Sequence, residues 1–182
     1  MFSAIARCMR YTAICAALKH DLRCRNPRHR TGRNNEQGDR GKMNTEQLAV
    51  FFYGLFMDQT LLAAKGIRPS RALAGHVDGY VLRIGSRATL VQDENHKVYG
   101  VLMTIGAADL TALYSEESVA DYEAKIVSVA LADGTHEAAV CYILPESKLQ
   151  GTNAQYASAL LELAARLNFP RHYLQQIRDQ AA

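Results

Sequence analysis

The stretch "LAVFFYGLFMDQTLLAAKG", residues 48–66, changes character at a single glycine. Its first six residues form a continuous apolar run of the length of a buried β-strand, and Gly54 follows directly after Tyr53. We interpret Gly54 as a point where the chain adopts a backbone conformation that other residues resist. A short helix is then predicted, capped by the side chain of Asp58 and closed by Gly66.

Downstream of this stretch, short strands alternate with few helices. Asp133-Gly134 is a residue pair that a tight hairpin favours. Because hairpins join most neighbouring strands, the fold class predicted is α+β, with a small mixed or antiparallel barrel-like sheet and a few short helices. The predicted strands cover residues 48–53, 76–85, 87–92, 96–105, 122–132 and 136–144, and the predicted helices lie within 58–64, 110–115, 156–167 and 170–177.

Charge divides the chain into two segments. Residues 1–42 hold 10 Lys+Arg against 3 Asp+Glu, whereas residues 43–182 hold 11 against 15. We predict that residues 1–42 are a basic, disordered extension and that residues 43–182 form the folded domain. The extension is interpreted as dispensable residues before a true start at Met43, as a targeting or secretory peptide, or as an arm for nucleic acid or a membrane surface. The acidic balance of the domain argues against the last interpretation, so neither partner is expected.

The cysteine positions and the hydropathy pattern indicate the cellular compartment of the protein. Three of the 4 cysteines lie within residues 1–42, at spacings that match no common zinc pattern. Cys141 stands alone in the domain, and its strand-like surroundings predict a small buried apolar residue. No apolar run approaches the roughly 18 residues of a membrane span. A reducing, cytoplasmic location is therefore expected.

Several common classes of enzyme and binding site find no support, because the sequence lacks the motifs that define them. The sequence contains no phosphate-loop, dinucleotide-binding, zinc-protease or nucleophile-elbow motif. The domain histidines are scattered over predicted strands, a turn and a helix, so we interpret them as solvated or capping residues. No metal and no cofactor are expected.

Two features remain, the break after Tyr53 and the acidic "SEES" at residues 115–118. Their order resembles the gamma-glutamylcyclotransferase-like family, which includes the gamma-glutamylamine cyclotransferases and plant avirulence-induced relatives. In that family a strand ends in Tyr-Gly-Ser or Tyr-Gly-Thr, a Val-x-Gly strand follows, and a short helix ends in a glutamate before Gly or Ser. The matching residues, between about 50 and 143, are Tyr53-Gly54, Val98-Tyr99-Gly100, Glu117-Ser118 and the strand-opening Tyr122.

The resemblance implies a reaction and the residues that perform it. A small gamma-glutamyl substrate would cyclise to 5-oxoproline and release an amine, without metal or cofactor. Glu117 is implied as the base, with its neighbour Glu116 as competitor, and Tyr122 as a hydroxyl donor to a substrate carboxylate. The implied binding loop, whose backbone N–H groups would hold a substrate oxygen, consists of Tyr53, Gly54, Leu55, Phe56 and Met57.

Two positions depart from the family pattern. Leu55 stands in place of the Ser or Thr after Tyr-Gly, and Tyr114 stands in place of an Asp before the glutamate. An alternative function is therefore a catalytically silent module of the same fold that binds another small ligand. The residues themselves are also compatible with a strand-to-helix turn whose apolar side chains fill the core, and with a solvated acidic turn.

Overall fold

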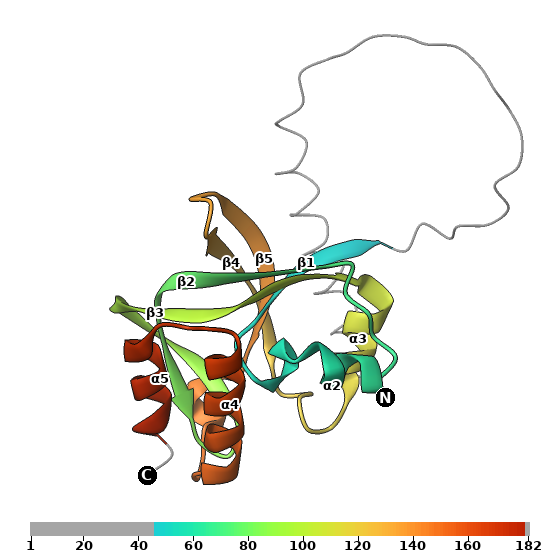
Figure 1. Ribbon diagram of the computed structural model, residues 1–182. Helices are drawn as coiled ribbons and strands as arrows, with labels where there is room; N and C mark the ends of the chain where they lie inside the picture. Colours follow the sequence, from blue (N-terminus) through green and yellow to red (C-terminus); the bar gives the residue numbers. More distant parts are fainter. Residues whose placement is uncertain (1–45, 181–182) are drawn as a thin grey trace, which may run out of the picture. The chain divides into compact units, whose positions relative to one another are not determined.

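The computed structural model describes residues 46–180, so the predictions for residues 1–42 lie outside the described part. Five strands close into a barrel in the order β1-β3-β2-β4-β5 (Figure 1). The predicted α+β class, with a barrel-like sheet and a few short helices, is confirmed. The strands are β1 (Gln47–Phe52), β2 (Arg71–Ile84), β3 (Ala88–Gly106), β4 (Glu123–Leu131) and β5 (His136–Ile143), and the helices are η1 (Leu55–Met57), α2 (Gln59–Ala64), α3 (Ala107–Ser115), η2 (Glu146–Lys148), α4 (Ala154–Arg166) and α5 (Arg171–Arg178).

Strand β1 joins the two ends of the sheet. It pairs antiparallel with β3 along its whole length and parallel with β5 at Val50↔Val140. Val50 and Phe51 are 0% and 1% exposed. Because neighbouring side chains on a strand point to opposite faces, both faces of β1 are covered, which explains its continuous apolar sequence.

Strand β3 is one long strand where the sequence predicted two. Its pairing with β2 is interrupted between Asp78 and Tyr80, opposite residues 93–96, and then resumes. Gly79 has φ of +79°, a left-handed conformation that glycine adopts without strain. The predicted break between strands at residues 87–92 and 96–105 is therefore wrong, because residues 93–95 lie within β3, at a bulge in its pairing with β2.

Local signals set the ends of the helices as predicted. The Asp58 carboxylate accepts the N–H of Thr60 at 2.9 Å and caps α2, and Gly66 follows that helix with φ of +80°. Asn168, with φ of +57°, ends α4. Gly134 has φ of +81° in the turn between β4 and β5, as the predicted hairpin requires.

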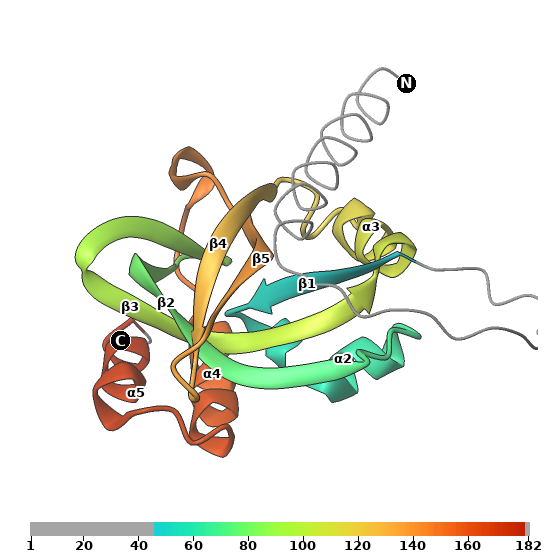
Figure 2. The same cartoon turned by 90° about the horizontal axis from the view of Figure 1, so that it is seen from above.

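The C-terminal helices α4 and α5 lie side by side against the long β2–β3 ribbon (Figures 1 and 2). Arg166, at the end of α4, donates at 3.0 Å to the carboxylate of Asp58, the residue that caps α2. Buried Tyr173 of α5 donates its hydroxyl to the carbonyl oxygen of Tyr99 in β3 at 3.2 Å. The Gln180 side chain accepts the N–H of Ile84 at 2.8 Å and donates to the carbonyl oxygen of Leu82 at 3.0 Å. The side-chain amide of Gln180 thus hydrogen-bonds to the backbone at the end of β2, as the backbone of a neighbouring strand would.

The cysteine of the domain has the predicted surroundings. Cys141 lies on β5, is free and is 0% exposed. Burial raises the pKa of its thiol far above the usual value, so it behaves as a small apolar residue. Within residues 46–180, no helix has the length and apolar composition needed to cross a bilayer.

Gly100 of β3 leaves room for β1 and offers a test of barrel packing. A Cβ at this position would lie 2.3 Å from the carbonyl oxygen of Phe52 and 2.5 Å from the ring of Phe51. We expect Gly100→Ala to lower the free energy of unfolding by about 1–3 kcal/mol, measured by urea denaturation, because a buried strand must shift. The control Lys97→Ala, at an exposed site of β3, is expected to change it by about 0.5 kcal/mol or less. Equal decreases in the free energy of unfolding for Gly100→Ala and Lys97→Ala would contradict the close approach of β1 to Gly100.

Candidate active site

Gly54 lies between β1 and η1, and its backbone is extended, with φ of −111° and ψ of −158°. The prediction that it adopts a conformation other residues resist is therefore wrong. The glycine provides space instead, because a Cβ at this position would lie 2.6 Å from the hydroxyl oxygen of Tyr156. Tyr156 belongs to the first turn of α4, and the backbone of Leu55 hydrogen-bonds to its hydroxyl. The loop and α4 thus meet at this hydroxyl.

The side chains of residues 53–57, the binding loop, divide into two sets. Tyr53 is buried and donates its hydroxyl to the carbonyl oxygen of Tyr142 at 3.0 Å, and Met57 is buried in the core. Leu55 and Phe56 are half-buried. The structure therefore leaves Leu55 and Phe56 accessible to a ligand and places Tyr53 and Met57 beneath them.

Aromatic side chains gather behind the binding loop. Tyr114 of α3 stacks on Tyr142 of β5 with ring centroids 3.5 Å apart, and its centroid lies 6.2 Å from that of Tyr122. Phe56 meets Tyr114 edge to face at 6.4 Å. Four tyrosines lie close enough to influence one another's ionisation, and we call them the tyrosine cluster: Tyr53, Tyr114, Tyr122 and Tyr156.

Burial keeps the tyrosine cluster protonated. It raises the pKa of Tyr53 and of Tyr114 well above the ordinary value of 10.0. It also raises the pKa of Tyr156, against the opposing hydrogen bond from the Leu55 backbone. The pKa of Tyr122 is raised to about 12, because burial outweighs the nearby guanidinium of Arg87. These hydroxyls are therefore neutral at physiological pH, a form in which a hydroxyl can donate to a carboxylate or carbonyl oxygen.

Residues 116–121, the acidic turn, connect α3 to β4 and carry both candidate bases. The Nζ of Lys65 lies 2.7 Å from each carboxylate oxygen of Glu116. Glu117 is exposed, and it makes no hydrogen bond or ion pair with any other residue in the described part of the chain. Glu117 is therefore not enclosed by apolar side chains. Of the two glutamates, only Glu117 is free to meet a ligand.

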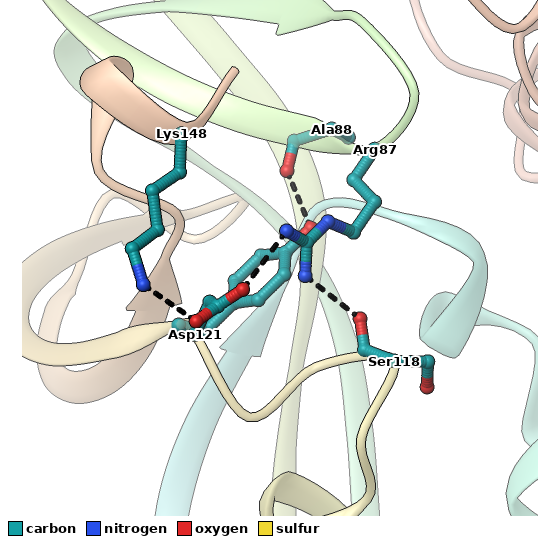
Figure 3. A network of polar contacts seen from close by, with 6 residues as sticks. Arg87, Ala88, Ser118, Asp121 and Lys148 are labelled. Carbon is teal, nitrogen blue, oxygen red and sulfur yellow. Dashed lines mark hydrogen bonds and ion pairs between the residues drawn. The ribbon is translucent and has the colours of Figure 1, made fainter. Parts of the chain in front are cut away.

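Two cations from other elements hold the acidic turn (Figure 3). Arg87, between β2 and β3, donates through Nη1 to the carbonyl oxygen of Ser118 and through Nη2 to Asp121, both at 3.1 Å. Lys148 of η2 reaches the other carboxylate oxygen of Asp121 at 2.5 Å. The hydrogen bonds from Lys148 and then from Arg87 hold the pKa of Asp121 below its usual value. The acidic turn is thus fastened from two sides.

Tyr122 closes the acidic turn against β3. Its hydroxyl donates to the carbonyl oxygen of Ala88 at 2.7 Å, and the Arg87 guanidinium lies 5.9 Å from the centre of its ring. The one proton of this hydroxyl is therefore already used by the backbone. Donation from Tyr122 to a substrate carboxylate, as implied by the resemblance, requires that this bond be exchanged.

Other candidate sites do not coincide with the binding loop. Among residues 46–180, no three His, Cys, Asp or Glu side chains come together in a way that could hold a metal. An open cavity of about 260 Å³ lies between β2 and β4, with Val77, Tyr80, Ile126 and His136 among its lining residues. It shares no residue with the binding loop, the tyrosine cluster or the acidic turn. The site residues predicted from the sequence therefore lie apart from this cavity, in the binding loop, in the acidic turn and at Tyr122.

Comparison with known proteins identifies the family of the chain. The sequence model of the family described as "Gamma-glutamyl cyclotransferase, AIG2-like" matches residues 50–159. The chain belongs to this family. Both the binding loop and the acidic turn fall within the matched residues, whereas no curated protein matches the chain.

Solved structures similar to this gamma-glutamyl cyclotransferase family member share its fold. One is described as a gamma-glutamyl cyclotransferase, with 17% identity, a TM-score of 0.59, and coverage of 73% of this chain and 87% of that chain. YkqA from Bacillus subtilis has 20% identity, a TM-score of 0.60, and coverage of 74% and 54%. The cyclotransferase specific to glutathione from yeast has 14% identity, a TM-score of 0.55, and coverage of 74% and 95%. At these identities the likeness shows the fold alone.

The structure explains how this cyclotransferase family member accommodates its two departures. Tyr114, in place of an Asp, belongs to the tyrosine cluster and stacks on the ring of Tyr142 in β5. Leu55, in place of Ser or Thr, has no hydroxyl group. The hydroxyl of Tyr156 lies next to the same loop, so a hydroxyl is still present there. Sequence reasoning did not single out Tyr156, Arg87 or Lys148 as site residues. The one signal for Tyr156 was a polar-tipped aromatic residue at the start of the helix predicted over residues 156–167.

The contact between Gly54 and Tyr156 leads to a prediction for the family member. We expect Gly54→Ala to lower the free energy of unfolding by about 1–3 kcal/mol, because the new methyl group meets the hydroxyl. In a Tyr156→Phe background the cost should fall, since the nearest remaining ring atom would be 4.0 Å away. A double-mutant cycle of urea denaturation measures the difference. The same cost in both backgrounds would contradict this role of Gly54.

The ion pairs of Asp121 lead to a pH prediction. Because the folded-state pKa of Asp121 is below the usual 3.8, its contribution to stability is present above that value and is lost as the pH falls through the lower, folded-state pKa. We expect the melting temperature of the wild type to exceed that of Asp121→Asn at neutral pH, and the two to converge in acid. Melting curves between about pH 2 and pH 7 measure this. A constant difference over that range would show that Asp121 does not titrate as proposed.

Proposed function

We propose that the chain is a gamma-glutamyl cyclotransferase that converts the gamma-glutamyl group of an amine or small peptide to 5-oxoproline and releases the amine. The observation that carries this proposal is the convergence of the binding loop, the tyrosine cluster and the acidic turn in a member of this family. The ring contacts from Phe56 to Tyr114 and from Tyr114 to Tyr122 link the three segments.

The proposed reaction is a rearrangement within one molecule. The α-amine of the glutamyl group attacks its own γ-carbonyl carbon, a ring C–N bond forms, and the original amide C–N bond breaks. One proton moves from the attacking nitrogen to the leaving nitrogen, so the reaction balances without an oxidant, a reductant or a cofactor. Since both reacting groups belong to the substrate, the main task of the site is to fold it, and such orientation can supply about 7–11 kcal/mol.

A base is needed because the α-amine, with a pKa of about 8, is mostly protonated at neutral pH. We assign this role to Glu117, the unpartnered carboxylate of the acidic turn. Glu116 is less suited because Lys65 engages both of its oxygens. A substrate between the acidic turn and the binding loop would cover the exposed Glu117 and exclude water from it. A well-placed acid/base group contributes about 10²- to 10⁴-fold in rate.

Neutral donors are proposed to hold the substrate. The N–H of Met57 already donates to the carbonyl oxygen of Gly54 at 3.0 Å. Another N–H group of the binding loop and the protonated hydroxyl of Tyr156 can donate to the γ-carbonyl oxygen as negative charge develops on it. The half-buried Leu55 and Phe56 would pack against the methylene groups of the glutamyl chain. In this arrangement Tyr53 and Met57 support the loop from beneath.

The surroundings of Glu117 also favour a second candidate function. Its side chain is exposed, and the accessible side chains of the binding loop are apolar. A catalytically silent module that binds a small ligand would need no buried base. Ligand-induced thermal stabilisation without turnover would identify this function.

We also propose a reducing compartment such as the cytoplasm as the place of action. Cys141, in the described part of the chain, is free and buried. A free thiol is compatible with a reducing environment, in which disulfides are rare.

The proposed function is tested by the release of 5-oxoproline, detected by mass spectrometry. The substrates are gamma-glutamyl amino acids, gamma-glutamyl-lysine derivatives and glutathione. Wild type is expected to release 5-oxoproline from at least one of them, and Glu117→Gln to reduce kcat by about 10²- to 10⁴-fold. Glu116→Gln is the matched control and should have a smaller effect, because Glu116 is engaged by Lys65.

Two outcomes would change the assignment. Loss of activity in Glu116→Gln alone would move the base by one residue. Absence of release by folded wild type from every substrate, together with thermal stabilisation by one of them, would favour the silent binding module.

A further inference from the structure

We propose that Arg87 is a positioning residue that fixes the acidic turn and thereby places Glu117. The effect of Arg87 on turnover rests on the proposed function, whereas its contact with the acidic turn does not. Arg87 is 30 residues away in sequence from Glu117 and lies on a different element. It touches the acidic turn at the residue directly after Glu117, through the carbonyl oxygen of Ser118.

The guanidinium group makes two contacts at once. Nη1 donates to the Ser118 carbonyl oxygen and Nη2 to the Asp121 carboxylate, each at 3.1 Å (Figure 3). The first contact fixes the backbone near the start of the turn and the second fixes its end. A planar guanidinium with rigidly spaced donors can join two such acceptors, whereas an ammonium group acts as a point charge.

Arg87 is itself held firmly. Its carbonyl oxygen accepts the N–H of Gly85 at 3.0 Å, which closes the hairpin between β2 and β3. The adjacent Ser86 donates its N–H to the carbonyl oxygen of Gln150 at 2.6 Å, and its own carbonyl oxygen accepts from Asn153 at 3.3 Å. The hairpin is therefore tied to the segment before α4, and the Arg87 side chain is only 29% exposed.

The acidic turn has few other supports for its backbone. Within it, Val119 donates its N–H to the carbonyl oxygen of Glu116, and Tyr122, the residue after the turn, donates its N–H to that of Val119, both at 3.1 Å. Among residues 46–180, Arg87 makes the one side-chain hydrogen bond to a backbone atom of the acidic turn. Lys65 and Lys148 reach only carboxylates, through flexible side chains. Loss of Arg87 should therefore free the backbone on the C-terminal side of Glu117.

Hydrogen exchange measured by mass spectrometry tests the contact itself, whether or not the protein turns over. In Arg87→Gln we expect the amides of Val119 and Tyr122 to exchange roughly tenfold faster or more, because local opening of the turn becomes easier. Arg87→Lys should give an intermediate rate, since Lys cannot join both acceptors. The matched control is Arg71→Gln, which removes another surface arginine paired with a carboxylate, that of Glu137 at 2.8 Å. Unchanged exchange at Val119 and Tyr122 in Arg87→Gln would overturn the proposal.

Turnover tests the consequence for Glu117. With the substrate that wild type cyclises, Arg87→Gln should lower kcat by roughly 10- to 100-fold with a smaller change in KM, because a misplaced base affects chemistry more than binding. In a Glu117→Gln background the same substitution should cost little more. Equal losses in both backgrounds would mean that Arg87 acts on the substrate directly, which would overturn the positioning role. If wild type cyclises nothing, the proposed function fails, while the exchange experiment still decides whether Arg87 fixes the turn.

Discussion

Closure of the barrel through β1 is the constraint on which the other features depend. β1 has a hydrogen-bonded partner on each side, antiparallel β3 and parallel β5, and both of its faces are buried. Its C-terminal end therefore has little freedom. The binding loop begins there, beside the carbonyl oxygen of Tyr142 on β5 that receives the Tyr53 hydroxyl. A flexible strand end would not hold the loop at a defined distance from α3 and α4.

The site that results separates neutral donors from charged groups. Its interior is built from aromatic rings and tyrosine hydroxyls, whose pKa values burial raises. The charges of Lys65, Arg87 and Lys148 lie at its edge, each paired with a carboxylate of the acidic turn. Burying a neutral hydroxyl that finds a partner costs far less than burying an ion. This division lets a polar site exist next to the core without unpaired buried charge.

Much of the fold could be predicted because its signals are local. Asp58 caps α2 with its own side chain, Asn168 takes up the left-handed conformation that ends α4, and Gly134 does so in the hairpin turn. The bulge in β3 could not be predicted, since Asp, Glu and Asn at residues 93–95 are typical of a turn. Pairing with β2 on both sides of the bulge outweighs that local preference.

The sequence by itself determined the strand and helix pattern except within β3, the fold class, and the two segments that carry the family's motifs. These depend on periodicity, on caps and turns, and on residues adjacent in the chain. Only the tertiary structure decided three contacts. Gly54 leaves the space that the hydroxyl of Tyr156 fills, Lys65 pairs with the carboxylate of Glu116, and Arg87 hydrogen-bonds to the acidic turn. Each of these contacts joins residues from separate elements. Their distances are set by barrel closure and helix packing, which no local pattern encodes.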